Sequence, residues 1–155
     1  MGGFFSKPTP VILCGKAEIV GKQVIEGLKP DIEVILFCQG SDPTAAEVPY
    51  ILRGVAPPTQ SSHIGSGRYS RRPKTVIMGA AWDENAVAQV KAAIQSAGLP
   101  PGTAPIILRN DTSVVTPKPP AREYGEQLIR RIRLVMGKLE RGEKVDGPEE
   151  GVVWY

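Results

Sequence analysis

The chain has little of several features that would place it quickly in a class. Its 155 residues include no apolar run of about 18, so the sequence predicts no membrane-spanning helix. Its two cysteines are too few for a disulfide framework. The two cysteines and the single histidine show no metal-ligand spacing, so we expect no metal site. A net charge of +3 is too mild to indicate nucleic-acid binding. No apolar signal sequence is present at the start, so we expect a cytoplasmic protein.

Length and composition fit one domain. A domain of this size buries roughly 68–70% of its unfolded surface, which is enough for a core of its own. Apolar residues make up 41% and charged residues 23%, both ordinary values, whereas 17 glycines and 15 prolines predict many connections. We therefore expect a flexible N-terminus over residues 1–10, a single domain over 11–139 and a C-terminal tail over 140–155.

The first residues carry one modification pattern. Met1, Gly2 and Ser6 match the loose motif for N-myristoylation. A single acyl chain gives marginal, reversible membrane binding, so we expect membrane attachment only if Gly2 is acylated. The alternative is a flexible start that ends at Pro8 and Pro10.

Strand-like and helix-like patterns alternate along the rest of the chain. PVILC, IEVILFC, TVIMGA and APIILR are short apolar runs rich in β-branched residues, typical of strands buried on both faces of a parallel sheet. Helical spacing follows them at 17–28, 41–54, 83–97 and 122–140, where Pro49 is expected to interrupt or kink the second helix. This order predicts an α/β fold, a Rossmann-like three-layer sandwich. Its parallel sheet would have about four strands in the order 2-1-3-4, right-handed crossovers, and helices on both faces.

Ligands of such sheets bind outside the carboxyl ends of the strands, at the topological switch point. Helix N-termini there favour an anion or phosphate. In the corresponding connections, small residues permit close approach, Lys16 and Arg109 add positive charge, and Trp82 could stack on a ring. The candidate ligand contacts are Gly15, Lys16, Ala17, Ser41, Gly79, Trp82 and Arg109.

The dinucleotide motif G-x-G-x-x-G is matched in part. Gly15 fits its first glycine, whereas Ala17 and Val20 stand at the other two positions. The acidic ribose ligand expected about 20 residues later is missing, although Ser41 could bond a ribose or its 2′-phosphate. These residues fit NADP somewhat better than NAD, and both cofactors stay candidates. Gln23 stands where a phosphate-binding P-loop needs Ser or Thr, which argues against an NTPase.

Catalytic candidates are few. Cys14 and Cys38 end neighbouring predicted strands and could form a redox pair or supply a reactive thiol; the alternative is a pair of buried core thiols. Asp111 follows the fourth strand and is a further candidate. The loop 55–74 contains His63 and several arginines, and it could be a basic docking patch or a solvated loop on the side away from the ligand crevice.

The tail ends in VVWY, four apolar or aromatic residues that need a partner surface. We expect residues 152–155 to dock on the chain's own fold, as an added edge strand or in a groove. The alternative is docking on a second molecule, which would make a homo-oligomer.

Taken together, VILCGKAEIVGKQVIEGLKP, EYGEQLIRRI and the final VVWY resemble a group of small fungal proteins of uncharacterised function with a Rossmann-like fold. The first βαβ unit more distantly resembles NAD(P)-binding domains. The resemblance implies an intracellular Rossmann-like domain and brings no catalytic residues. Three hypotheses follow: binding of a nucleotide or other anionic small molecule, a non-catalytic interaction or dimerisation protein without cofactor, and a small enzyme using Cys14 or Asp111.

Overall fold

The computed structural model describes residues 7–79 and 82–155, so the expected acylation motif at Gly2 and Ser6 lies outside the described residues. The strands are β1 (Thr9–Gly15), β2 (Ile32–Gln39), β3 (Thr75–Met78), β4 (Ile106–Arg109) and β5 (Val152–Trp154). The helices are α2 (Glu18–Leu28), α3 (Ser41–Leu52), α4 (Glu84–Ser96) and α5 (Arg122–Glu140). None of the helices in this part of the chain is long and apolar enough to cross a membrane.

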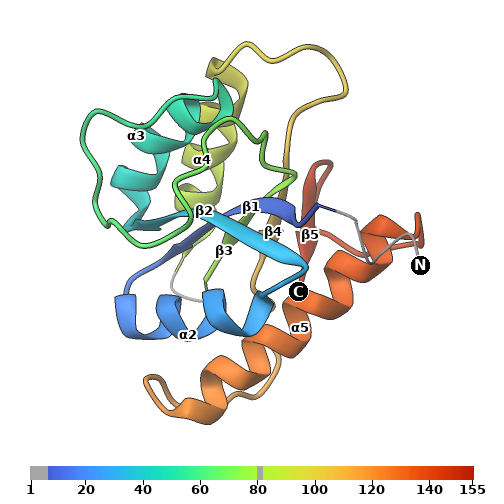
Figure 1. The fold of residues 1–155 in the computed structure, drawn as a ribbon. Coiled ribbons are helices and arrows are strands. Elements are labelled where there is room, and N and C mark those ends of the chain that lie inside the picture. Colours follow the sequence, from blue (N-terminus) through green and yellow to red (C-terminus); the bar gives the residue numbers. More distant parts are fainter. Residues whose placement is uncertain (1–6, 80–81) are drawn as a thin grey trace.

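The strands form one parallel sheet in the order β2-β1-β3-β4-β5, with helices on both faces (Figure 1). This confirms the Rossmann-like sandwich, with one strand more than the sequence predicts. The added strand is the tail, where Val152, Val153 and Trp154 align with Ile107, Leu108 and Arg109 of β4. Contrary to expectation, α3 continues through Pro49 to Leu52. Pro49 lies in the last turn, where its missing N–H removes one helical hydrogen bond.

Alternation along the strands divides the core into two apolar layers. Ile12, Val76 and Ile107 point to the face that α3 and α4 cover. Their neighbours Leu13, Ile77 and Leu108 point to the face that α2 and α5 cover. Because side chains alternate between the faces of a strand, each central strand must be apolar throughout, which explains the unbroken runs in the sequence.

The last crossover has the opposite hand from the other three. The steps from β3 to β4 and from β4 to β5 go the same way along the sheet, yet α4 and α5 lie on opposite faces. The connections through α2 and α3 share the hand of the connection through α4. Since right-handed crossovers predominate, the β4-α5-β5 connection is left-handed, unlike the expectation. As a result, α5 lies beside α2 and not beside α4 (Figure 1).

Close contacts hold α5 against α2. A Cβ atom on Gly27 of α2 would lie 2.2 Å from Cδ1 of Ile129, so glycine permits the close approach of the two helices. From α5, Arg133 donates to the carbonyl oxygens of Gly27 (3.0 Å) and Lys29 (3.1 Å) and pairs with Asp31 at 2.7 Å. These carbonyls end α2 and have no partner within it, so Arg133 caps the helix from a neighbouring element.

The loop that joins α3 to β3 covers the outer edge of β2. Phe37 N–H donates to the Ile64 carbonyl at 2.9 Å, and Ser66 N–H donates to the Val34 carbonyl at 2.8 Å. Gly65 has φ +131, and a Cβ there would lie 2.5 Å from the Ile35 carbonyl oxygen. An exposed strand edge invites pairing with another chain, and this segment occupies the edge without forming a regular strand. The loop is therefore part of the fold.

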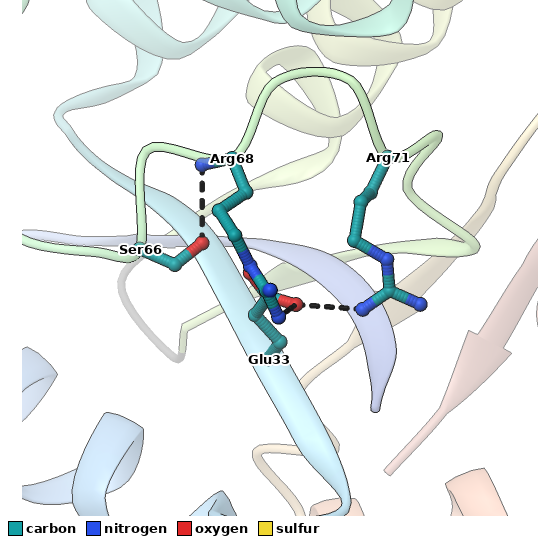
Figure 2. A network of polar contacts seen from close by, with 4 residues as sticks. All are labelled: Glu33, Ser66, Arg68 and Arg71. Atoms are coloured by element: carbon teal, nitrogen blue, oxygen red, sulfur yellow. Dashed lines mark hydrogen bonds and ion pairs between the residues drawn. The ribbon is translucent and has the colours of Figure 1, made fainter. Parts of the chain in front are cut away.

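Two arginines of this loop clamp one buried carboxylate of β2 (Figure 2). Arg68 donates to Glu33 through Nε and Nη2, both at 2.8 Å, and Arg71 donates through Nη1 at 2.6 Å. The Glu33 side chain is 8% exposed. Hydrogen bonds from Arg68 above all lower the Glu33 pKa from 4.5 to about 2. Both arginines therefore serve an internal ion pair, which leaves less of the loop for a basic docking patch.

Glu33→Gln should make stability less dependent on pH. The folded-state pKa is below 4.5, so the stabilising contribution is complete above that pH and is lost as the pH falls toward 2. One pKa unit corresponds to about 1.4 kcal/mol, and solvent screens the exposed Arg68, so we expect a loss of about 2 kcal/mol at pH 7. Urea unfolding between pH 7 and pH 3 measures the difference, which should shrink as the pH falls. Glu26→Gln, which alters an exposed pair with Lys29, is the control. A constant difference from pH 7 to pH 3 would contradict the role of Glu33.

Val152→Ala tests the docking of β5. Val152 is 1% exposed, so removing two methyl groups should lower the free energy of unfolding by about 1–2 kcal/mol. Val115→Ala removes the same atoms from a residue that is 89% exposed and should change it by less than about 0.5 kcal/mol. Equal unfolding midpoints for the two variants would mean that β5 does not contribute to the core in solution.

Candidate functional site

A cavity of about 340 Å³ lies at the carboxyl ends of β1 and β3, between α2 and α5. The helix after β1 covers one face of the sheet and the helix after β3 covers the other, so the cavity lies at the predicted switch point. It brings together five of the predicted contacts and borders on Cys14. These predicted contacts are Gly15, Lys16, Ala17, Gly79 and Trp82.

Aromatic side chains make up much of the wall. The whole chain has three Phe, four Tyr and two Trp residues, and four of these aromatic residues line this one cavity: Phe37, Trp82, Tyr124 and Tyr155. They come from β2, the turn after β3, α5 and the tail. Leu128 and Ile132 of α5 complete the apolar side. Sequence reasoning missed all of these except Trp82, since it had no reason to place α5 or the tail at the ligand crevice.

Hydrogen bonds hold Tyr155 at both its side-chain hydroxyl and its backbone oxygen. Its hydroxyl donates to the Met78 carbonyl at 2.7 Å, and its own carbonyl accepts from Asp111 N–H at 2.8 Å and Arg131 Nη2 at 2.7 Å. The Arg131 guanidinium lies 5.6 Å from the centre of the tyrosine ring. Burial raises the pKa of Tyr155 far above its ordinary value, so the hydroxyl stays protonated and remains a donor. The tail thus supplies a rigid wall of the cavity.

Glycines of the first βα turn allow the aromatic packing. A Cβ on Gly21 would lie 2.8 Å from Cε1 of Phe37, and a Cβ on Gly15 would lie 3.1 Å from the same atom. The phenyl ring therefore fills the space that side chains at these positions would need. Gly21 accordingly serves packing between the helix and the sheet, the third role of glycine in nucleotide-binding turns.

The N-terminus of α2 is not arranged for a pyrophosphate. Glu18 occupies its first turn and accepts a 2.5 Å hydrogen bond from the buried Ser62 hydroxyl. Gln39 donates to the Lys16 carbonyl at 2.9 Å and Gly40 N–H donates to the Gly15 carbonyl at 3.1 Å, which closes the turn. Glu18 thus adds a negative charge to the first turn of α2, the helix end that would face the phosphates of a dinucleotide. Because Ser62 contacts Glu18, the loop 55–74 reaches the carboxyl ends of the strands. The sequence predicted this loop on the opposite side, away from the ligand crevice.

Three of the sequence candidates lie away from the cavity. Ser41 begins α3, which covers the opposite face of the sheet. The Arg109 guanidinium lies 5.1 Å from the ring centre of Trp154, its neighbour in β5. Asp111 accepts from the backbone N–H and the hydroxyl of Ser113 in a local turn, and these bonds lower its pKa. These contacts give Arg109 and Asp111 structural roles, and Ser41 is on the far face of the sheet from the cavity.

The thiol of Cys14 is buried in the layer beneath α3, on the side of the sheet away from α2 and α5. Cys14 and Cys38 are free and are aligned neighbours in β1 and β2. Burial raises the pKa of Cys14 from 9.0 to about 12 and that of Cys38 well above 9.0. A reactive cysteine needs a lowered pKa, so the surroundings favour core thiols over a nucleophile.

The polar groups of the cavity are few. Lys16 is the one charged residue among the described residues that line it, and its Nζ lies 5.8 Å from the ring centre of Trp82. Within residues 7–79 and 82–155, no three His, Cys, Asp or Glu side chains gather in a way that could hold a metal ion. The arrangement therefore offers an apolar, aromatic chamber with one cationic group.

Thiol labelling tests the state of the two cysteines. A pKa near 12 leaves on the order of a thousandfold less thiolate than a pKa near 9. We expect iodoacetamide at pH 8 to modify neither cysteine in the folded protein. Both should be modified in about 8 M urea, where the chain is unfolded, and the intact mass measures the labelling. The variant Cys38→Ala isolates Cys14. Native-state labelling at the rate seen in urea would restore Cys14 as a reactive thiol.

The chain is similar to a protein of Aspergillus oryzae (strain ATCC 42149 / RIB 40) that is named Kojic acid related protein 6. The two are 28% identical over 142 residues, which cover 90% of this chain and 83% of the relative. No family model matches the chain, and no solved structure matches it. The similarity extends over nearly the whole of both chains.

Proposed function

We propose that this chain binds a small, ring-shaped organic molecule in the switch-point cavity, with an anionic or polar group of the ligand near Lys16. The observation that carries the proposal is the gathering of four aromatic residues from four separate segments around one cavity. Ligand pockets are typically concave, mostly apolar and equipped with few polar groups. A flat ring would stack on such walls, and Lys16 would attract negative charge.

The size of the cavity narrows the ligand class. Small-molecule sites span about 300–1,000 Å³, and a volume of about 340 Å³ is near the lower limit. A nucleobase or a comparable ring fits this size, with a phosphate left outside, whereas NAD or NADP would extend well beyond it. Glu18 in the first turn of α2 adds repulsion toward a pyrophosphate. Among the expected anionic ligands, these features favour a small one.

The name of the Aspergillus oryzae relative supplies one specific probe. It associates that protein with kojic acid, an oxygen heterocycle with polar oxygens on a single ring. A ring of this class matches the size and the aromatic lining described above. Kojic acid is therefore a reasonable member of a ligand panel, on equal terms with other small rings.

Ligand binding is favoured over the other two hypotheses. The tail and the arginines Arg68 and Arg71, which supported an interaction protein, make contacts within this chain. Burial raises the pKa values of Cys14 and Tyr155, so neither group is prepared for acid–base or nucleophilic chemistry. We therefore propose binding without assigning a reaction.

A ligand panel with a blocked variant tests the proposal. The panel comprises benzoate, kojic acid, nicotinate, AMP, FMN and NADP(H), and the readout is the thermal unfolding midpoint. A ligand at 100 times its Kd stabilises by about 2.7 kcal/mol, which should raise Tm by roughly 5–10 °C for a chain of this size. Val20→Phe puts a ring into the cavity and should abolish the shift.

Ile19→Phe is the matched control, because Ile19 is the next residue of α2 and is 67% exposed. It should leave the shift unchanged. The proposal fails if no panel member shifts Tm, or if a shift persists unchanged in Val20→Phe.

A further inference from the structure

Lys16 carries a positive charge that no described carboxylate neutralises. The residue is exposed and lines the switch-point cavity. Its Nζ lies 5.8 Å from the ring centre of Trp82, which lines the same cavity. The ion pairs formed within residues 7–79 and 82–155 do not include Lys16. The ammonium group is therefore at the cavity wall and available to a ligand.

The nearest carboxylate along the chain, that of Glu18, is held by the loop 55–74. Glu18 lies in the first turn of α2, two residues after Lys16, and it accepts a hydrogen bond from Ser62 Oγ at 2.5 Å. Ser62 is 2% exposed, and its oxygen also accepts from Ile64 N–H at 3.4 Å. Because the same loop closes the edge of β2, the fold itself fixes this serine. The contact directs the Glu18 carboxylate to the loop and leaves Lys16 unpaired.

We infer that the cavity selects rings that carry a single carboxylate, because Lys16 pairs with the ligand and Ser62 keeps Glu18 from pairing with Lys16. This inference rests on the proposed function, and it narrows the ligand class to aromatic and heteroaromatic monocarboxylates. Lys16 determines the specificity in this scheme. Ser62 is a positioning residue that acts through Glu18.

The balance of charge favours a carboxylate over a phosphate. One ammonium group neutralises one negative charge, whereas a phosphate ester carries nearly two at neutral pH. Glu18 in the same turn repels the second charge, since like charges close together are unfavourable. A carboxylate on a ring also lies in or near the ring plane, so the ring can pack on the aromatic walls while its oxygens reach Lys16.

Benzoate and benzamide test the role of charge, since these planar rings have nearly the same shape and only benzoate is ionised at neutral pH. The wild-type protein should bind benzoate about tenfold more tightly, because a charge-assisted hydrogen bond is stronger than a neutral one. Lys16→Met keeps the apolar stem and removes the ammonium group, so the two affinities should agree within about twofold. Titration calorimetry measures both.

Lys22→Met is the matched control. Lys22 is an exposed lysine of the same helix and does not line the cavity, so the preference for benzoate should stay at its wild-type value. Benzamide is neutral and should bind every variant with the wild-type affinity. This binding also shows that each variant keeps its fold and its cavity.

Ser62→Ala tests the positioning role. Loss of the hydroxyl frees the Glu18 carboxylate to pair with Lys16, which should weaken benzoate binding about threefold, as expected for an exposed ion pair. Adding Glu18→Gln to Ser62→Ala should restore the affinity for benzoate, because the competing charge is removed. A purely structural effect of Ser62 would instead weaken both rings and would persist in the double variant.

The outcomes distinguish the proposed function from this inference. If neither ring binds the wild-type protein, the proposed function fails for rings of this size and the inference fails with it. If both rings bind equally well, the cavity binds rings regardless of charge, which overturns the inference while the proposed function survives. If Lys16→Met removes the preference and Ser62→Ala does not change it, the role of Ser62 is overturned. A preference that both variants reduce and that Glu18→Gln restores in Ser62→Ala supports the inference in full.

Discussion

The packing of α5 against α2 is the constraint on which the cavity and the fifth strand depend. Gly27 lets Ile129 approach, and Arg133 caps the end of α2 with three donated hydrogen bonds. With α5 fixed on this face, the chain can reach β5 only through a left-handed connection. Tyr155 then arrives beside Tyr124, Leu128 and Ile132, and the four close one side of the cavity. A right-handed connection would have put α5 next to α4 and left this side open.

Both outer edges of the sheet are occupied by irregular segments of the same chain. Residues 64–67 pair with β2, and Trp154 N–H of β5 donates to the Asp146 carbonyl at 2.8 Å. Open edges are the usual route by which sheet proteins add a strand from another molecule. The tail and the loop 55–74 close these edges through contacts within the chain. This explains why two segments that the sequence suggested for binding partners contribute to the stability of the fold.

The sequence predicted most of the sheet and a smaller part of the site, for reasons of periodicity. Apolar runs marked four strands, and the carboxyl ends of parallel strands must converge, so Gly15, Lys16, Ala17, Gly79 and Trp82 could be grouped without coordinates. The rest depended on tertiary contacts that leave no periodic trace. Three residues are too few to distinguish an added edge strand from a segment docked in a groove, so both stayed open for β5, and the usual handedness rule predicts the wrong face for α5. Arg109, predicted at the ligand site, stacks on Trp154 of that strand.

The cavity lies where nucleotide-binding crevices lie in folds of this kind, and its lining differs from theirs. In a phosphate site the backbone N–H groups at a helix N-terminus point to the ligand, which requires glycines and no nearby carboxylate. Here Glu18 occupies that helix turn, and the space beside Gly15 and Gly21 is filled by Phe37. Under the proposed function, affinity would come from stacking and apolar burial, which carry little directional information. A site of this kind needs a few fixed polar atoms to select among rings of similar size. Among the described residues that line the cavity, Lys16 is the charged group that could do this, and its Nζ lies 5.8 Å from the ring centre of Trp82.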